Sequence, residues 1–516
     1  MADPTPPGVA DSAFAQALEK LRAAVGPKWV FIGEDHRTSY LDPFAIGDPQ
    51  EHASVGAVAP ATTEELRAVL QTANDYRIPV WPISMGKNFA YGSAAPKLKD
   101  SLILDLKRMN KVLEVDERLG YALVEPGVSF FDFKEELARR GSRLWMSGPS
   151  QSWGSVIGNA LEHGVGYTPY GNHAEMICGI EVMLADGSLV RTGVGAVENT
   201  REWQCHKWPF GPNWDGLFTQ SNFGIVTKMG IWLMPEPAGM AGVSISIPRR
   251  DQLADLVDVL QRLRLDDTIN APYTLTNAWR QLTSGRRRPE IYRGEGAIPR
   301  AVVESVLDAA GSGWWSVTFN LFDRPAALDI RLAAIAGEFS SALPDAAIKV
   351  QRWERGEQHQ PWMRQEVGLA PMAIVDWPGG RGGHTDLGPI VAPVGERVEE
   401  VYLAIEQRFL EFGIDPWIGM FGISNRALIM VADLIFNRDD ADMVARCRTL
   451  FRVLCEDLTG MGVALYRSHI TFMDDVVKMH AWGDHALPRL NDRLKAMLDP
   501  NGILAPGKQG IGAYRA

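Results

Sequence analysis

Alternating apolar and polar positions predict short strands and helices through the first 240 or so residues. Residues 63–76, TEELRAVLQTANDY, place apolar side chains at helical spacing behind a threonine suited to an N-cap. The other elements predicted here are a strand over 78–84, two short strands over 101–128 around a turn near Glu117–Gly120, a helix over 129–142 closed by Gly141, and a hairpin over 180–190 that turns at Asp186-Gly187.

The pattern changes after PEPAG (235–239), which is typical of a linker. Helical periodicity with strands between indicates a second α+β domain. Its predicted helices are 251–265, 327–343, 400–412 and 441–457, with a flexible Gly-rich loop at 377–389 and an aperiodic, turn-rich tail at 499–510.

Length and charge narrow the class of protein. A chain of 516 residues exceeds what one core usually organises, so two or more domains are expected. The net charge of −11 would repel a negatively charged phosphate backbone, which argues against a nucleic-acid partner.

The N-terminus lacks signal-peptide character and no run suits a membrane helix, so the expected location is the cytoplasm, or the periplasm if a partner co-exports the chain. The cysteines, at 178, 205, 447 and 455, lack metal-site spacing, so we expect isolated buried thiols and no metal.

A first Gly-containing segment, SMGKNFAYGSAAPK (84–97), follows directly after the predicted strand at 78–84. Small residues at this place allow backbone N–H groups to approach a pyrophosphate. The pattern is neither GxGxxG nor GxxxxGK[ST], so a Rossmann or Walker site is excluded. Taken alone, a turn that only connects elements is the simpler interpretation.

Two further segments share this character. Residues 148–173, GPSQSWGSVIGNALEHGVGYTPYGNH, hold too many glycines for a regular helix or strand and would suit a backbone pressed against a large flat ligand. A long irregular surface loop is an equal alternative for them. In 218–235, FTQSNFGIVTKMGIWLMP, a polar turn precedes a strand.

These segments, together with YRSHITFMD (466–474) and DPNGILAPGKQG (499–510), resemble the vanillyl-alcohol oxidase/p-cresol methylhydroxylase family of FAD flavoproteins. GVGYTPYG, SNFGIVTK and NGILAPGK occur in the family's order. The resemblance implies a two-domain α+β, PCMH-type FAD-binding fold with an α+β cap domain. The implied division is an FAD-binding domain at 1–240, a cap or substrate domain at 241–464, and a C-terminal segment at 465–516 that returns to the FAD-binding domain.

The resemblance also implies which residues contact FAD. Those predicted are Ser84, Met85, Gly86, Lys87, Asn88 and Phe89 in the pyrophosphate loop, Pro149, Ser150, Ser152, Ser155, Gly158, Asn159, Gly164 and Tyr167 in the second segment, Gly224, Ile225 and Val226 in the third, and Arg467 and Lys508 near the C-terminus.

Tyr91, Tyr466 and Arg467 fall where the family keeps two tyrosines and an arginine around a phenol oxygen. Two hydroxyls and a guanidinium would lower the pKa of a bound phenol and stabilise its phenolate. Hydride loss from the benzylic carbon then gives a neutral p-quinone methide, with flavin N5 as acceptor. The resemblance therefore implies oxidation or hydroxylation of a para-substituted phenol. Without it, Tyr466 and Arg467 would be assigned ordinary surface roles.

Two positions depart from the family pattern. The oxidase branch has an aspartate where this chain has Ser150, and a hydroxyl does not act as a general base without an activating neighbour. The methylhydroxylase branch resembles this chain in carrying serine there, which favours a dehydrogenase or hydroxylase that passes electrons to a cytochrome c or similar acceptor. Ile429, Met430 and Phe436 occupy the positions assigned to the flavin-linking histidines and tyrosine, so non-covalent FAD is expected.

Other functions stay open at this point. They are an oxygen-using aryl-alcohol or 4-alkylphenol oxidase, a flavin-dependent 2-hydroxyacid or lactone dehydrogenase, and a catalytically silent flavin-binding subunit. Lignin-derived phenols, such as 4-alkylphenols of aromatic catabolism, fit the implied chemistry. The family commonly forms homodimers, so a homodimer is expected, without nucleic-acid or membrane partners.

Overall fold

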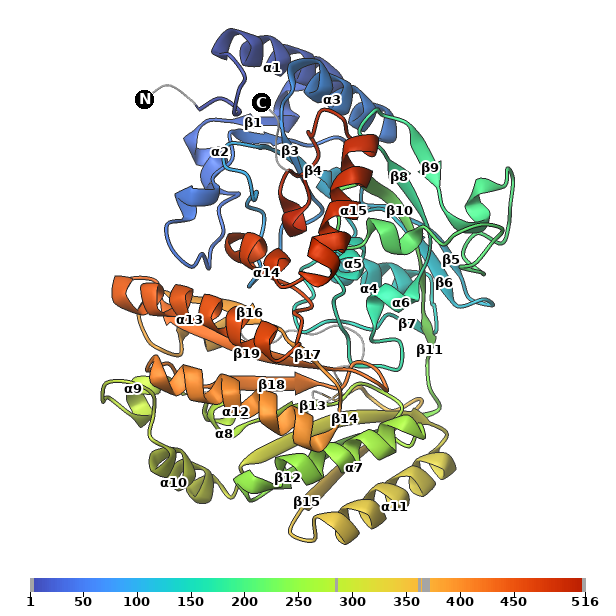
Figure 1. The fold of residues 1–516 in the computed structure, drawn as a ribbon. Coiled ribbons are helices and arrows are strands. Elements are labelled where there is room, and N and C mark those ends of the chain that lie inside the picture. The colour runs from blue at the N-terminus through green and yellow to red at the C-terminus, as the bar shows by residue number, and fades with distance from the viewer. Residues whose placement is uncertain (1–3, 284–285, 361–362, 364–371, 513–516) are drawn as a thin grey trace. The chain divides into compact units, whose positions relative to one another are not determined.

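The chain packs as two compact units, seen in the computed structural model of Figure 1, which describes residues 4–283, 286–360, 363 and 372–512. Unit 1 comprises Met1–Val165, His173–Pro235 and His469–Ala516, and unit 2 comprises Gly166–Asn172 and Glu236–Ser468. These boundaries differ by a few residues from the predicted ones at 240 and 464. The stretch Gly166–Asn172, which the sequence assigned to the first domain, groups with unit 2.

Unit 1 begins with a small sheet in the order β1-β2-β4-β3. Its strands are β1 (Val30–Ile32), β2 (Gly56–Val58), β3 (Val80–Ile83) and β4 (Leu102–Asp105), and β2, β3 and β4 run parallel. Helices α1 (Asp11–Val25) and α3 (Thr63–Tyr76) pack against each other and contribute to the core beside this sheet, while α2 (Glu34–Thr38) lies next to β1 and β2.

Helix α3 coincides with the predicted helix at 63–76. Thr62 accepts the Glu65 backbone N–H at 3.1 Å, which satisfies one of the unpaired donors of the first turn. Leu66, Val69 and Leu70 are wholly buried at helical spacing.

An antiparallel sheet in the order β5-β6-β10-β8-β9 forms the second part of unit 1. Its strands are β5 (Val112–Asp116), β6 (Tyr121–Val124), β8 (Ile177–Met183), β9 (Leu189–Arg191) and β10 (Ile225–Trp232), and the associated elements are α4 (Phe130–Arg139), β7 (Leu144–Trp145), α5 (Val156–Leu161), α6 (His173–Met176) and β11 (Met234–Pro235). Ser129 and Asp132 form a capping box at α4. The predicted hairpin at 180–190 is β8 and β9.

The prediction of two strands over 101–128 was incomplete. The segment contains β4, β5 and β6, and β4 lies in the β1-β2-β4-β3 sheet while β5 and β6 pair in the other. Local alternation does not reveal which partner a strand takes, because that choice depends on residues far away in the sequence.

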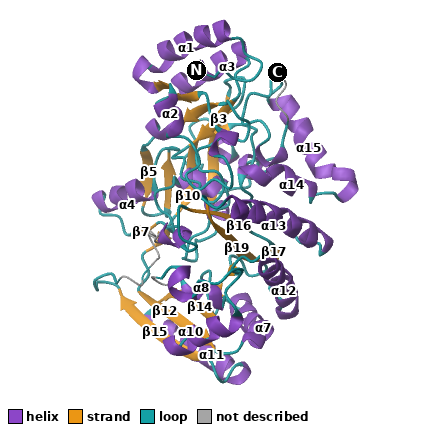
Figure 2. Ribbon diagram, turned by 90° about the vertical axis from the view of Figure 1, so that its left-hand side faces the viewer, coloured by secondary structure: helices purple, strands orange, loops and turns teal. Residues whose placement is uncertain are grey.

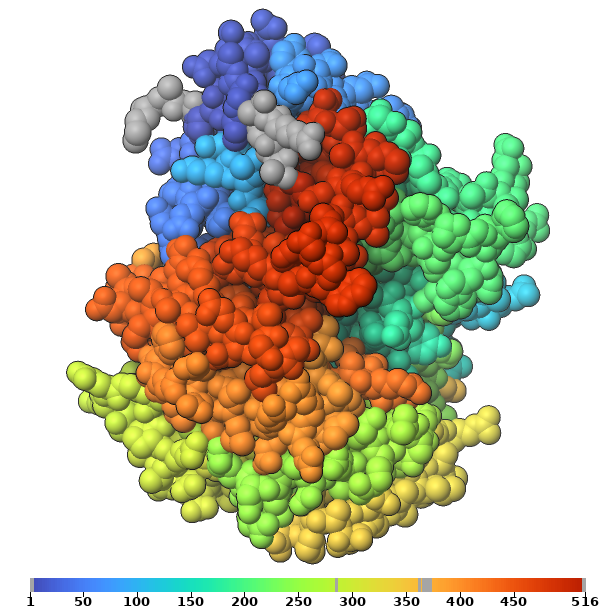
Figure 3. All heavy atoms as spheres, viewed as in Figure 1, coloured from blue at the N-terminus to red at the C-terminus, as the bar shows by residue number. Residues whose placement is uncertain are grey.

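The C-terminal segment returns to unit 1 through α14 (Met473–Lys478) and α15 (Trp482–Leu498). Figure 3 shows these red residues at the surface beside the blue N-terminal ones, and Asn501 bonds Asn74 of α3 at 2.9 Å. The Val80 N–H donates to the Ile503 carbonyl and the Ala505 N–H to the Val80 carbonyl, both at 2.8 Å. The tail thus extends the edge of the sheet at β3.

Unit 2 is built on an antiparallel sheet in the order β15-β12-β14-β13-β18-β19-β16, with β17 also paired to β19 (Figure 2). The strands are β12 (Gly239–Ile247), β13 (Thr274–Thr276), β14 (Trp315–Asp323), β15 (Ala347–Glu354), β16 (Gly382–Leu387), β17 (Ile390–Val391), β18 (Trp417–Phe421) and β19 (Leu428–Asn437). The helices are α7 (Leu253–Leu265), α8 (Ala278–Leu282), α9 (Arg288–Ile291), α10 (Arg300–Ala310), α11 (Pro325–Ala342), α12 (Gly395–Glu411) and α13 (Ala441–Gly460). Helix α11 packs on β12 and β14, and α13 packs on β19.

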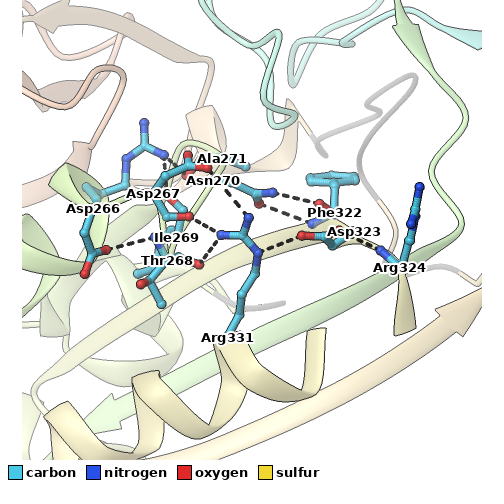
Figure 4. Close-up of polar contacts among 11 residues, drawn as sticks. Asp266, Asp267, Thr268, Ile269, Asn270, Ala271, Phe322, Asp323, Arg324 and Arg331 are labelled. Carbon is cyan, nitrogen blue, oxygen red and sulfur yellow. Dashed lines mark hydrogen bonds and ion pairs between the residues drawn. The ribbon is translucent and has the colours of Figure 1, made fainter. Parts of the chain in front are cut away.

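A polar network fixes the connection between α7 and β13 to the end of β14 (Figure 4). Arg331 of α11 donates to Asp323 at 2.9 Å and to the Thr268 carbonyl at 3.2 Å. Asn270 pairs with both backbone groups of Phe322, donating to the carbonyl at 2.7 Å and accepting the N–H at 3.2 Å. These bonds pair backbone groups of the loop, at Thr268, and of the end of β14, at Phe322.

The predicted flexible loop at 377–389 was wrong for six of its thirteen residues. Residues Gly382–Leu387 form β16, which pairs with β19 from Gly382↔Asn437 to Leu387↔Ala432. Glycines lower strand propensity but do not forbid a strand when a partner supplies the ladder.

Within the ranges that the structure describes, helices long and apolar enough to cross a membrane are absent. All four cysteines are free thiols. Cys178, Cys447 and Cys455 are buried as expected, whereas Cys205 is exposed.

Candidate active site

The loop 84–91 leaves β3 through a tight turn. The Asn88 carbonyl accepts the N–H groups of Tyr91 at 3.2 Å and Ser93 at 3.0 Å. Gly86 has φ +63° and a Cβ there would lie 2.9 Å from Ala94, so the position requires glycine. Ala90 and Ser93 also adopt positive φ, an energetic cost that concentrates at functional sites.

The composition of this loop suits an anionic group. Residues Ser84, Met85, Gly86, Lys87, Asn88 and Phe89 include a hydroxyl, an amide and an ammonium group but lack a carboxylate. Phe89 packs edge-on against Phe44, with ring centroids 5.5 Å apart. The donor set therefore fits a pyrophosphate held by main-chain and hydroxyl donors.

The second predicted segment lies against this loop. Ser152 is wholly buried and donates to the Pro149 carbonyl at 3.2 Å. Ser155 caps α5 by accepting the Gly158 N–H at 3.0 Å. A Cβ on Gly158 would lie 2.5 Å from Ser84 Oγ, so the two segments meet where Gly158 lacks a side chain. Ser150 precedes this turn and is half-buried.

Asn159 is held by a buried histidine. His173 Nδ1 lies 2.6 Å from Asn159 Oδ1, and a Cβ on Gly164 would collide with the Asn159 side chain. Burial lowers the pKa of His173 to about 4, so the imidazole is neutral near pH 7 and donates from Nδ1 to the amide oxygen. This bond fixes the orientation of the Asn159 amide.

The third segment and the tail complete the same region of unit 1. Ile225 and Val226 begin β10 opposite Met183 and Val182, and a Cβ on Gly224 would lie 2.4 Å from Val182. Asn222 donates to the carbonyls of Ala505 at 2.9 Å and Ile511 at 3.0 Å. Lys508 forms an ion pair with Glu162 of the second segment.

Unit 1 therefore brings together the pyrophosphate loop, residues 149–164, residues 222–226 and Lys508. These segments are held together mainly by close approaches at glycines, capped turns and main-chain hydrogen bonds. Such a region offers main-chain N–H donors, which suit a dinucleotide. The residues present fit FAD. Tyr167 lies in the stretch that groups with unit 2.

Tyr466 and Arg467 lie in unit 2 and are associated with each other. The Arg467 guanidinium carbon is 5.8 Å from the Tyr466 ring centroid, a cation–π distance. The Tyr466 N–H donates to the Gly388 carbonyl at 2.9 Å, and a Cβ on Gly388 would lie 2.5 Å from the tyrosine ring. Gly388 thus provides the space for this ring, a role that the sequence did not predict.

Tyr91, of unit 1, is joined to the segment that follows Arg467. The Ile470 N–H donates to the Tyr91 carbonyl at 3.3 Å, and Tyr91 itself is 7% exposed. Ile470 is three residues beyond Arg467 along the chain.

Strand β19 presents two different faces. Ile429, Val431, Asp433 and Ile435 keep 5–8% exposure, whereas the alternate residues from Leu428 to Phe436 are wholly buried. We call the first set the β19 face. Of the positions considered for flavin attachment, Ile429 lies on this face, while Met430 and Phe436 point to the other side.

An acidic pair occupies the β19 face. Asp433 is opposite Asp386 of β16, and Arg280 donates to Asp433 at 3.3 Å. Burial and the neighbouring Asp386 charge raise the pKa of Asp433 well above its ordinary value, although Arg280 acts in the opposite direction. Sequence inspection missed this pair because it depends on strand pairing 47 residues apart.

His384 is a second residue that the sequence analysis missed. His384 lies on β16, opposite Ile435 of β19, and is half-buried. An imidazole is one of the groups able to bond a flavin. The expectation of non-covalent FAD was drawn only from Ile429, Met430 and Phe436.

Comparison with known families and proteins agrees with these features. The FAD binding domain family matches residues 55–193, and the family of FAD linked oxidases, C-terminal domain, matches residues 323–509. The 4-cresol dehydrogenase [hydroxylating] flavoprotein subunit of Pseudomonas putida is 33% identical over 98% of this chain and 97% of that protein.

Two solved structures share the whole fold. A p-cresol methylhydroxylase with substrate bound superimposes with a TM-score of 0.93 at 31% identity, covering 98% of this chain and 99% of that chain. A 4-ethylphenol oxidase from Gulosibacter chungangensis, in an isoeugenol complex, gives 0.93 at 30% identity, covering 99% of each chain.

The fold and these matches define an FAD-dependent oxidoreductase with a PCMH-type FAD-binding fold. The chain belongs to the vanillyl-alcohol oxidase/p-cresol methylhydroxylase family of FAD flavoproteins. The predicted family, fold class and FAD cofactor are confirmed.

Proposed function

We propose that this chain oxidises the benzylic carbon of a para-substituted phenol. The observation that carries the proposal is the pairing of Tyr466 with Arg467 in unit 2, on a segment that continues into the backbone bond between Ile470 and Tyr91. The relatives named for 4-cresol and 4-ethylphenol support the same substrate class.

The proposed role of Arg467, Tyr91 and Tyr466 is to hold the substrate oxygen as a phenolate. A guanidinium and hydroxyl donors in a site with little water stabilise the negative charge and lower the pKa of the phenol. FAD, when bound, supplies the acceptor for the hydride that leaves the benzylic carbon.

Loss of the phenolic proton and the benzylic hydride converts the substrate into a p-quinone methide. Water then adds its oxygen to the benzylic carbon, and the ring oxygen regains a proton as the phenol. The product is a 4-hydroxybenzylic alcohol, and a second oxidation of the same carbon gives the aldehyde or ketone.

Anaerobic stopped-flow spectroscopy tests this function. 4-Ethylphenol and 4-cresol are expected to bleach the flavin of the purified protein, whereas lactate and sugar lactones leave it oxidised. Bleaching by lactate but not by the phenols would instead support the 2-hydroxyacid dehydrogenase alternative.

We also propose that a separate electron acceptor reoxidises the flavin. The relative from Pseudomonas putida is named as a flavoprotein subunit, and Ser150 cannot supply the carboxylate of the oxidase branch. The reduced protein is expected to react faster with cytochrome c than with air. Faster reoxidation by air would support the oxidase alternative, as the name of the 4-ethylphenol oxidase does.

The predicted non-covalent attachment is tested by acid precipitation. Flavin is expected to stay in the supernatant when the protein is precipitated. A yellow pellet would contradict non-covalent attachment. His384→Ala is then the variant to examine, because His384 carries an imidazole and is paired with Ile435 of the β19 face.

A further inference from the structure

A buried carboxylate in unit 1 connects segments that are distant in the sequence. Asp42 follows α2 and is 4% exposed. Its Oδ1 accepts the Phe44 N–H at 3.1 Å and the Ser93 hydroxyl at 2.9 Å. Its Oδ2 lies 3.0 Å from Nε2 of His469, which is 1% exposed.

The tautomer of His469 follows from its second nitrogen. Nδ1 lies 3.1 Å from the Thr471 backbone nitrogen, which can only donate a hydrogen bond. Nδ1 is therefore the acceptor, and the ring proton is on Nε2, where it is donated to Asp42.

The residues that make these bonds are close in sequence to the proposed catalytic residues. Ser93 is two residues after Tyr91, and His469 is two residues after Arg467. Between them the Ile470 N–H bonds the Tyr91 carbonyl, and a Cβ on Gly92 would lie 2.7 Å from the Ile470 side chain.

A second histidine reinforces the same connection. His52 Nδ1 lies 3.1 Å from the carbonyls of Pro96 and Lys97, and its Nε2 lies 3.3 Å from the Thr471 hydroxyl. Lys97 also pairs with Asp474 at 2.7 Å. The segments 91–97 and 469–474 are thus joined along their length.

The surroundings of Asp42 favour its ionised form. Burial acts to raise the pKa of its carboxyl, but the hydrogen bond from His469, followed by those from Phe44 and Ser93, outweighs burial and lowers the pKa. A buried charge is costly, and an apolar side chain of similar volume often stabilises a fold as well or better. What the carboxylate provides is a defined geometry for its donors.

We propose that Asp42 and His469 are positioning residues that fix the Tyr91 loop and the chain that carries Tyr466 and Arg467. Neither residue is assigned a contact with the substrate. The inference rests on the proposed function, because it concerns the placement of the groups that would bind the phenolate.

Asp42→Asn tests the proposal with almost no change in shape. Both the Phe44 N–H and the His469 Nε2–H are donors, so an amide cannot accept both, whichever way it is turned. The limiting rate of anaerobic flavin reduction by 4-ethylphenol, per bound FAD, is expected to fall by about tenfold to a hundredfold. His469→Ala is expected to have the same effect, and the double variant to be no slower than either single one.

Rescue separates positioning from general damage. His469→Gln keeps an N–H donor for Asp42 and is expected to recover most of the reduction rate. Ser93→Ala removes a single bond without disturbing the fold and is expected to slow reduction by about threefold.

Asp105→Asn is the matched control. Asp105 is also buried in unit 1, at 3% exposure, and accepts bonds from Tyr40 at 2.9 Å and the Lys107 N–H at 3.1 Å. The Asp105→Asn variant is expected to lower the melting temperature about as much as Asp42→Asn does, while its flavin is reduced at the wild-type rate.

Wild-type reduction rates per bound FAD in Asp42→Asn, or in both Ser93→Ala and His469→Ala, would overturn the positioning role while leaving the proposed function intact. Failure of every phenol to reduce the wild-type flavin would remove both.

Discussion

The predicted cofactor segments of unit 1 and the β19 face of unit 2 are constructed in opposite ways. In unit 1, glycines, capped turns and main-chain bonds bring four distant segments together, as at Gly158 and Ser84. In unit 2, acidic side chains are brought together by strand pairing, as in Asp386 opposite Asp433. One region is specified by where side chains are missing, and the other by which side chains face each other.

This difference explains what each region can contribute. Main-chain donors suit an invariant ligand such as a dinucleotide, because their geometry is independent of side-chain identity. A sheet face can change one side chain at a time without altering the fold, which suits a substrate pocket. Substitutions in the predicted cofactor segments should therefore affect FAD binding, and those around Tyr466 and Arg467 should affect the reaction.

The largest effect is expected from Arg467→Ala in unit 2. In the proposed mechanism, loss of the guanidinium leaves the phenolate without its cation, so flavin reduction should fall by ~10²–10³-fold or more. FAD content is expected to stay near the wild-type level. Arg426→Ala, which removes an exposed arginine just before β19, is the control and should reduce normally.

In unit 1, His173 predicts a pH-dependent stability. The unfolded chain binds its proton with a pKa of 6.5, whereas the folded chain does so only at about 4. The free energy of unfolding is therefore unaffected by this group above pH 6.5. It falls as the pH drops from 6.5 to about 4, by up to about 3 kcal/mol, because only the unfolded chain binds the proton in this range. Urea unfolding at pH 7 and pH 4.5 measures the change.

The control for His173 is His173→Asn, which does not titrate. Its stability should fall less between the same two pH values, although it is lower at pH 7. Equal pH dependence in the two proteins would show that other groups account for the change.

Local sequence signals predicted helices in both units, such as α3 and α13, whereas features that depend on distant segments were missed. Glycine positions, the Thr62 cap and the Asp186-Gly187 turn are local signals that act within a few residues. β16 was predicted to be a flexible loop because its glycines lower strand propensity and its partner strand, β19, lies about 50 residues later in the sequence. The roles of Gly388 and Asp42 likewise exist only after distant segments have come together.

Gly158→Ala tests the claim that unit 1 depends on absent side chains. The added methyl would lie 2.5 Å from Ser84 Oγ and must displace this hydroxyl, which belongs to a predicted FAD contact. Such overpacking costs about 1–3 kcal/mol, so FAD affinity is expected to fall by ~10–100-fold. Flavin release measured by fluorescence after dilution gives the affinity.

Gly154→Ala is the matched control for this effect. It lies in the same segment, but the nearest atom to its Cβ is the Gln151 carbonyl at 3.8 Å. FAD affinity should be unchanged there. A similar loss in both variants would point to disturbance of the segment as a whole and not to its approach to Ser84.

The smallest effect is expected from Gly388→Ala, the equivalent substitution in unit 2. The methyl would lie 2.5 Å from the Tyr466 ring, which must turn aside and take its hydroxyl with it. Flavin reduction by 4-ethylphenol should slow by about tenfold while FAD affinity is retained, because misplacing one of several donors costs less than removing the cation. Gly337→Ala, with open space around its Cβ, is the control. If Gly388→Ala lost FAD and kept its rate per bound flavin, the division of labour between the two units would be wrong, since a change confined to the surroundings of Tyr466 would then have acted on the cofactor.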